Sequence, residues 1–270
     1  MFKVRAVSGV ILVAIALATI LAGGPVLIVT LLFCSVMGMQ EYFKATGAAE
    51  GRIDQFGKIS PLTAAAFLGA VCYYVLLFLG QEKWYGPEIV LTLLLILAVY
   101  VFTFPKYKAP QVAAVFFGLV YVAVMLGFIY LTRAEENGQI TVWLIFLSSW
   151  GADTCAYLAG RAFGKHKMAP VLSPKKSVEG AVGGVIGAGI LGVIFSLAFN
   201  GGEMMAVYLI TCACGALISM IGDLAASAVK RDHGIKDYGT LIPGHGGILD
   251  RFDSVIFTAP VIYCLTQLLM

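Results

Sequence analysis

Residues 1–24 read MFKVRAVSGVILVAIALATILAGG, in which two basic residues precede a long apolar run. Such a segment is either a secretory signal that is removed or the first membrane-spanning helix of the chain. Eight further apolar segments follow it, so we favour a retained first span. The nine candidate spans are residues 6–23, 25–43, 61–80, 87–104, 110–132, 140–160, 180–199, 204–226 and 254–269.

The composition supports the same interpretation. Hydrophobic residues make up 60% of the 270 residues and charged residues only 12%, and the mean hydropathy is +0.93. A soluble domain usually carries about 25% charged residues, so this chain has too little charge to cover a water-facing surface. Helices of about 17–25 apolar residues cross a bilayer core roughly 30 Å thick. The sequence therefore predicts an all-α, polytopic integral membrane protein with about nine transmembrane helices.

Basic residues are distributed unevenly between the loops. If the N-terminus is cytoplasmic and successive loops alternate between the two sides, only Lys83 and Arg133 of the 18 Lys and Arg residues fall outside the cytoplasm. This is the positive-inside pattern of membrane proteins. It predicts a cytoplasmic N-terminus in a multi-pass protein of the cell's inner (plasma) membrane. Topology alone explains the basic loops, so we expect no nucleic-acid partner.

Polar groups gather on the predicted cytoplasmic side of the C-terminal half, in GADTCAYLAGRAFGKHK (151–167), LSPKKSVEG (172–180) and the run 222–253. We therefore divide the chain into two regions. Residues 1–135, with about five spans, are expected to form a scaffold that could also carry homodimer contacts. Residues 136–270 are expected to form the catalytic region, with its active site at the cytoplasmic face.

The hexapeptide GAGILG (187–192) matches the dinucleotide-binding pattern G-x-G-x-x-G. That pattern requires a preceding strand and a βαβ unit, whereas this segment lies inside an apolar span. Small residues recur at positions 180, 183, 184, 187 and 188, a spacing that lets membrane helices approach closely. We interpret the glycines as a helix-packing surface, either within one chain or between two chains.

Two carboxylates lie within predicted spans, Asp153 and Asp223. A lone carboxylate in a membrane helix costs about 2.5–3.5 kcal/mol, so each is expected to face the protein interior beside a cation or a donor. On a helix, Asp223, Ser227 and Lys230 share one face. The simplest alternative is that each aspartate pairs with a lysine or arginine and only joins helices.

Residues 227–253 read SAVKRDHGIKDYGTLIPGHGGILDRFD. Asp250 and Asp253 are three residues apart, so they share a face at the start of the last helix. First-turn acids also cap helices, which could explain one of them. Clustered carboxylates favour a hard cation such as Mg²⁺, which is commonly completed by substrate phosphates. Glycines let backbone N–H groups approach phosphate oxygens, and the adjacent Lys175 and Lys176, after a predicted proline turn, suit a polyanion.

The same run resembles the signature of the phosphatidate cytidylyltransferase family, also called CDP-diacylglycerol synthases. The matching pattern is Ser-x-apolar-Lys-Arg, a later Lys-Asp, an apolar-Pro-Gly-His-Gly-Gly step and Asp-Arg-apolar-Asp. The segments DTCAYLAGRAFGK and LSPKKSVEG resemble further parts of that family, so the resemblance covers roughly the C-terminal half. It implies that CTP and phosphatidate, a membrane lipid, react to give CDP-diacylglycerol and pyrophosphate with Mg²⁺ at the cytoplasmic leaflet.

On this basis we assign hypothetical roles to the polar residues. Catalytic roles go to Asp223, Asp250, Lys230 and Arg251. Substrate binding goes to Ser227, Arg231, Lys236, Lys175, Lys176, Gly244, His245, Gly246 and Gly247. Mg²⁺ is assigned to Asp223 and Asp250, then to Asp253 and Asp153, and a second cation stays open. A deprotonated lipid phosphate is already a nucleophile, so we do not assign His245 as a general base.

Two other functions are compatible with parts of the sequence. Intramembrane aspartates also occur in proton- or ion-coupled transporters, but the polar residues here gather on one face rather than at the bilayer midplane. A CDP-alcohol phosphotransferase would carry an Asp-Gly-x-x-Ala-Arg pattern, which the sequence lacks. Release of pyrophosphate from CTP in the presence of phosphatidate would separate the three.

Overall fold

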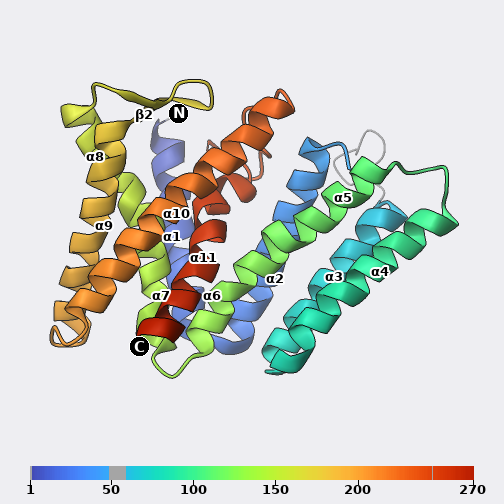
Figure 1. Cartoon of the computed structure of the whole chain (residues 1–270), viewed down its shortest axis with the longest axis horizontal. Coiled ribbons are helices and arrows are strands. Elements are labelled where there is room, and N and C mark those ends of the chain that lie inside the picture. Colours follow the sequence, from blue (N-terminus) through green and yellow to red (C-terminus); the bar gives the residue numbers. More distant parts are fainter. Residues whose placement is uncertain (1, 49–58, 245) are drawn as a thin grey trace. The chain divides into compact units, whose positions relative to one another are not determined.

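The computed structural model describes residues 2–48, 59–244 and 246–270, with side chains from Ser8 onward (Figure 1). The predicted cytoplasmic residues Arg52 and Lys58 lie outside these ranges. The first helices are α1 (Phe2–Ala22), α2 (Gly24–Ala45), α3 (Pro61–Phe78) and α4 (Tyr85–Phe102), with a 3₁₀ turn at Glu82–Trp84. Two longer helices each contain a π-helical segment: α5 (Ala109–Gly118), η2 (Leu119–Val124) and α6 (Met125–Ala134), then α7 (Gly138–Phe146), η3 (Leu147–Gly151) and α8 (Ala152–Phe163).

The C-terminal part begins with a short hairpin and ends in three long helices. Strands β1 (Lys167–Ala169) and β2 (Ser173–Ser177) pair antiparallel, with Lys167 opposite Ser177 and Ala169 opposite Ser173. The helices are α9 (Val178–Phe199), α10 (Met205–Asp232) and α11 (Leu249–Leu269). The fold is thus helical as predicted, but no pattern in the sequence indicated the hairpin. Ser173–Ser177 is a strand rather than the expected proline turn.

In the part of the chain that the structure describes, helices occupy all nine predicted positions, and seven segments are long and apolar enough to cross a membrane. These are Gly24–Ala45, Pro61–Phe78, Glu82–Phe102, Ala109–Ala134, Val178–Phe199, Met205–Asp232 and Leu249–Leu269. The described apolar part of α1, Ser8–Ala22, is shorter. The helix that contains Asp153 and Arg161 is not among the seven. A polytopic membrane protein is therefore confirmed, whereas the count of nine spans and the cytoplasmic N-terminus stay predictions.

The chain forms two compact units. Unit 1 contains Met1–Tyr130 and His233–Arg251, and unit 2 contains Leu131–Asp232 and Phe252–Met270. The sequence analysis divided the chain at residue 135 into a scaffold and a catalytic region, and this functional division stays a prediction. The compact units follow a different boundary, because the segment His233–Arg251 packs with the N-terminal residues.

Unit 1 has a core of aromatic and aliphatic side chains that also contains hydrogen-bonded polar groups. Tyr74 on α3 is 1% exposed, and its hydroxyl bonds the Ser35 hydroxyl (2.8 Å) and the Ala123 carbonyl (3.2 Å). A buried hydroxyl without hydrogen-bond partners would destabilise the fold. These two bonds remove that cost for Tyr74, and they connect α3 to α2 and to η2. Helix α3 begins at a proline and is capped by the Ser60 side chain, which accepts from the Thr63 N–H.

Unit 2 is held together by close contacts between helices α8, α9 and α10. A Cβ atom at Gly183 would collide with Ala159, and one at Gly187 would collide with Cys155, both on α8. A Cβ atom at Gly192 would lie 2.6 Å from the Tyr208 carbonyl oxygen on α10. The predicted packing surface of small residues is therefore confirmed, and it is used within the chain.

Candidate active site

Two lysine–carboxylate pairs bring together four of the predicted site residues in unit 2. Lys176 on β2 forms an ion pair with the Asp223 carboxylate on α10. Lys230, in the last turn of α10, places its Nζ 4.0 Å from the Asp253 Oδ2 on α11. Lys230 and Asp253 are both buried, each 9% exposed. The stripe predicted for Asp223 and Lys230 therefore joins α10 to both β2 and α11.

Asp153 on α8 is electrostatically coupled to the same groups. Lys176 and Asp223 both act on its carboxylate, and Asp153 and Asp223 both act on Asp253. We call Asp153, Asp223, Asp253, Lys176 and Lys230 the charge cluster. It contains three carboxyl groups and two lysine ammonium groups. Asp153 therefore lies beside a cation, as expected, although its side chain is exposed within this chain.

Local backbone structure explains how these groups meet. The π-helical segment η3 leads directly into α8, and its Ser148 and Ser149 hydroxyls donate to carbonyls one turn back, in α7. Such segments inside helices are frequent at functional sites. A Cβ atom at Gly222 would lie 2.9 Å from the Asp253 carbonyl oxygen. The glycine next to Asp223 therefore lets the backbone of α11 approach α10.

The hairpin presents only one of its two lysines to the charge cluster. Successive side chains of a strand point to opposite faces, so the adjacent Lys175 and Lys176 of β2 diverge. Lys176 pairs with Asp223 and is half-buried, whereas Lys175 is exposed. The sequence predicted that both lysines bind substrate after a proline turn. Because Ser173–Ser177 is a strand, only Lys176 faces the charge cluster.

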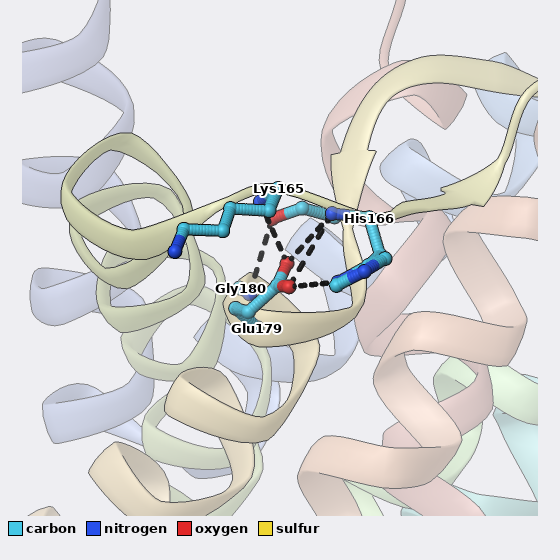
Figure 2. Close-up of polar contacts among 5 residues, drawn as sticks. Lys165, His166, Glu179 and Gly180 are labelled. Atoms are coloured by element: carbon cyan, nitrogen blue, oxygen red, sulfur yellow. Dashed lines mark hydrogen bonds and ion pairs between the residues drawn. The ribbon is translucent and has the colours of Figure 1, made fainter.

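Glu179, in the first turn of α9, closes the base of the hairpin (Figure 2). Its carboxylate accepts the backbone N–H of Lys165 (3.0 Å) and of His166 (3.2 Å), and the His166 Nδ1 lies 2.6 Å away. The Val178 N–H also donates to the His166 carbonyl (2.9 Å). An acid in the first turn of a helix is favourable for α9 as well. Glu179 therefore fixes both ends of the segment that carries Lys176.

Glu179→Gln is expected to loosen this hairpin, because the amide retains one acceptor oxygen and presents an NH₂ group to the backbone donors. Backbone amides of residues 165–177 should exchange faster in hydrogen–deuterium exchange mass spectrometry, and turnover should fall a few-fold. Glu203→Gln, an exposed change in the loop before α10, is the control. Unchanged exchange of the hairpin in Glu179→Gln would contradict this role.

The glycine-rich loop before α11 belongs to unit 1 and is organised around Asp250. The Asp250 Oδ2 accepts the N–H of Tyr238 (2.8 Å) and of Gly247 (3.0 Å), and its side chain is 6% exposed. Gly244 and Gly246 have φ angles of +77° and +84°, which favour glycine. The predicted metal ligand Asp250 therefore also holds the loop closed. Its metal-binding role, and phosphate binding by the Gly244–Gly247 turn, stay predictions.

Glu41 on α2 is a further participant that the sequence analysis missed. Its Oε1 accepts the Ile248 N–H (3.1 Å) and its Oε2 accepts the Leu249 N–H (2.9 Å) at the start of α11. Ser8 on α1 also donates to the Pro243 carbonyl (3.1 Å). Glu41 carries no motif, and it stands at the polar end of an apolar span where an acid is unremarkable. Only its sequence-distant contacts reveal it.

The other predicted residues are distributed over both units. Ser227 is buried on α10, beside Lys230 on the same helix face. Arg231 and Lys236 are exposed. Arg251 is half-buried, and within the described ranges its Nε–H is a buried donor that meets no acceptor. His245 lies outside the described residues.

The donor set of the charge cluster suits Mg²⁺, which prefers carboxylate oxygens. In residues 2–48, 59–244 and 246–270, however, no group of three or more His, Cys, Asp or Glu side chains is placed to share one ion. Lysines stand between the carboxylates instead. The carboxylates are thus of the donor type that suits a divalent cation, Asp223 and Asp253 each lie beside a lysine, and metal binding by them stays a prediction.

Comparison with known proteins assigns the chain to a family. The model of the cytidylyltransferase family matches residues 3–269. The chain is 37% identical over 163 residues to a phosphatidate cytidylyltransferase of Rickettsia prowazekii, covering 58% of this chain and 71% of that protein. It is 35% identical over 214 residues to that of Thermotoga maritima, covering 73% and 78%.

A relative of full length gives the same result. The phosphatidate cytidylyltransferase of Staphylococcus aureus (strain COL) is 31% identical over 272 residues, which cover 96% of this chain and 97% of that protein. The similarity thus includes the N-terminal helices, where the sequence analysis found no motif. Because the family model matches nearly the whole sequence, the chain belongs to the cytidylyltransferase family.

Proposed function

We propose that this protein transfers the cytidylyl group of CTP to phosphatidate, giving CDP-diacylglycerol and pyrophosphate, at the cytoplasmic face of the inner (plasma) membrane. The observation that carries the proposal is the charge cluster, which lies in a membrane-spanning chain of the cytidylyltransferase family. A transporter would not require a cytidylyltransferase fold, and the comparisons do not support that alternative.

The reaction joins two anions. A phosphate oxygen of phosphatidate forms a bond to the α-phosphorus of CTP, the P–O bond between the α- and β-phosphates breaks, and the electron pair leaves with pyrophosphate. No proton has to be removed from a deprotonated lipid phosphate. The protein's task is therefore to align the two phosphates and to stabilise negative charge on the transferred and leaving groups.

The lysines of the charge cluster can supply this stabilisation. Each ammonium group has three N–H donors, so Lys176 and Lys230 can retain a carboxylate and also bind a phosphate oxygen. Asp223 and Asp253 are the carboxylates that would hold Mg²⁺, with Asp153 close to both. When bound, Mg²⁺ would neutralise charge on the carboxylates and on the phosphates of CTP. Further roles for Asp250, Arg251, Arg231 and Lys236 stay predictions.

The exposed side of α8 supports lateral entry of the lipid. Asp153 is exposed, and Tyr157, one turn further along the same helix, is 64% exposed. A phosphatidate molecule could bring its phosphate to this helix while its acyl chains stay in the hydrocarbon. A homodimer and the absence of a nucleic-acid partner stay predictions from the sequence.

The proposal is tested with purified protein in phosphatidate-containing micelles. We expect pyrophosphate release from CTP only when phosphatidate is present, loss of that release when EDTA removes divalent cations, and its return with excess Mg²⁺. Diacylglycerol in place of phosphatidate is the control, because it lacks the attacking phosphate. Pyrophosphate release that is equally fast without phosphatidate would contradict the proposal.

A further inference from the structure

Glu41 binds the start of α11 with both carboxylate oxygens. The first N–H groups of a helix have no partner within it, and those of Ile248 and Leu249 are taken up by Glu41, which lies 207 and 208 residues earlier in the chain. Glu41 is 6% exposed, so these bonds are shielded from water. A buried carboxylate that accepts two backbone donors fixes both the position and the direction of the helix start.

The neighbouring loop is shaped to admit this carboxylate. A Cβ atom at Gly239 or at Gly247 would collide with the Glu41 carboxylate. Neither residue has a positive φ angle, so backbone conformation does not explain the two glycines. The absence of a side chain at both positions is explained by the space that Glu41 occupies.

Asp250 closes the same loop from the other side. Its Oδ2 accepts the Gly247 N–H, and the next two N–H groups along the chain go to Glu41. The two carboxylates thus share three successive backbone donors. Any displacement of Glu41 would therefore be transmitted through residues 247–249 to Asp250 and Arg251.

We propose that Glu41 is a positioning residue for the transferase reaction: it sets the start of α11 and thereby the place of Asp250 and Arg251. The inference rests on the proposed function, in which Asp250 and Arg251 are assigned to metal and phosphate. Under this inference, helix α2 of the N-terminal region contributes to the reaction through Glu41, whereas the sequence analysis assigned that region only a scaffold role.

Glu41→Gln in the full-length protein tests this role, because the amide keeps the size of the side chain but can accept only one of the two N–H groups. We expect the amides of residues 247–249 to exchange faster in hydrogen–deuterium exchange mass spectrometry. Turnover should fall about tenfold or more, as expected for the loss of a hydrogen bond to a charged group. The Mg²⁺ concentration for half-maximal turnover should rise several-fold.

Glu88→Gln is the matched control. Glu88 is also a glutamate of unit 1, is 8% exposed and accepts a hydrogen bond from Thr92 on its own helix, α4. It should leave the Mg²⁺ dependence and the exchange of residues 247–249 unchanged. If Glu41→Gln cannot be obtained folded, Gly239→Ala replaces it, since the added methyl group would displace the Glu41 carboxylate, and the same results are expected.

The outcomes separate the inference from the proposed function. Wild-type turnover and Mg²⁺ dependence in Glu41→Gln would overturn the inference, whether or not exchange is faster, because Glu41 would then support only the fold. Lost turnover with unchanged exchange of residues 247–249 would overturn it too, because the effect would not pass through these bonds. If the wild-type protein makes no CDP-diacylglycerol, the proposed function fails, while the exchange result still reports whether Glu41 holds the loop.

Discussion

Asp223→Ala is expected to lower CDP-diacylglycerol formation by at least about a hundredfold, the loss typical when a group that stabilises transition-state charge is removed. Asp223 pairs with Lys176 and acts electrostatically on both Asp153 and Asp253. Its removal leaves Lys176 without its carboxylate partner and takes away a proposed Mg²⁺ ligand. The measurement is the initial rate with saturating CTP, phosphatidate and Mg²⁺.

The matched control is Asp232→Ala, which removes an exposed aspartate from the last turn of the same helix, α10. Both variants should elute from gel filtration in detergent as the wild-type protein does. Asp232→Ala should keep a rate within a few-fold of wild type. Full activity in Asp223→Ala would contradict the assignment of the charge cluster as the active site.

Lys176→Met is expected to lower kcat/KM for CTP about ten- to a hundredfold. A hydrogen bond to a charged group contributes about 1.5–3 kcal/mol, and about 1.4 kcal/mol corresponds to a tenfold change in rate. Methionine keeps the length and apolar stem of the side chain, so β2 should retain its pairing with β1. The measurement is the dependence of initial rate on CTP concentration.

Lys175→Met is the control for this prediction. The two lysines are adjacent and equally charged, but β2 directs only Lys176 to Asp223, and Lys175 is exposed. Lys175→Met should therefore have much the smaller effect. If both variants lose activity equally, the lysines act as a general basic patch and the strand geometry does not determine their roles.

The membrane fold could be predicted from the sequence because hydropathy is a local property. Each apolar run was identified from its own residues, and a helix is present at every predicted position. The close approach of α9 to its neighbours was equally local, because glycine spacing alone indicates a helix surface without side chains. The bounds of α11 were less accurate, since it begins at Leu249, where contacts with the loop and with α2 satisfy its first N–H groups.

The site was only partly predictable. Asp223 and Lys230 could be placed on one helix face from their spacing, but their partners come from β2 and α11, and no local pattern indicates that pairing. The β1–β2 hairpin has no apolar alternation, so its residues resembled a turn. Its effect is to separate the roles of Lys175 and Lys176.

Asp250 and Glu41 show why helix-capping groups are difficult to identify in a sequence. Asp250 was assigned to metal because it shares a helix face with Asp253, yet its Oδ2 accepts two backbone N–H groups of the preceding loop. Glu41 forms bonds of the same kind across more than 200 residues. Such bonds depend on tertiary structure, which brings a carboxylate to backbone groups that any residue type can supply.

The central claim, attack of a lipid phosphate on the α-phosphorus of CTP, is tested most directly by following labelled phosphates. Purified protein is incubated with phosphatidate, Mg²⁺ and CTP that carries ³²P at either the α- or the γ-position. We predict that α-label enters the chloroform-soluble lipid and that γ-label is recovered only in pyrophosphate. Transfer of γ-label to lipid, or no transfer of α-label, would contradict this account.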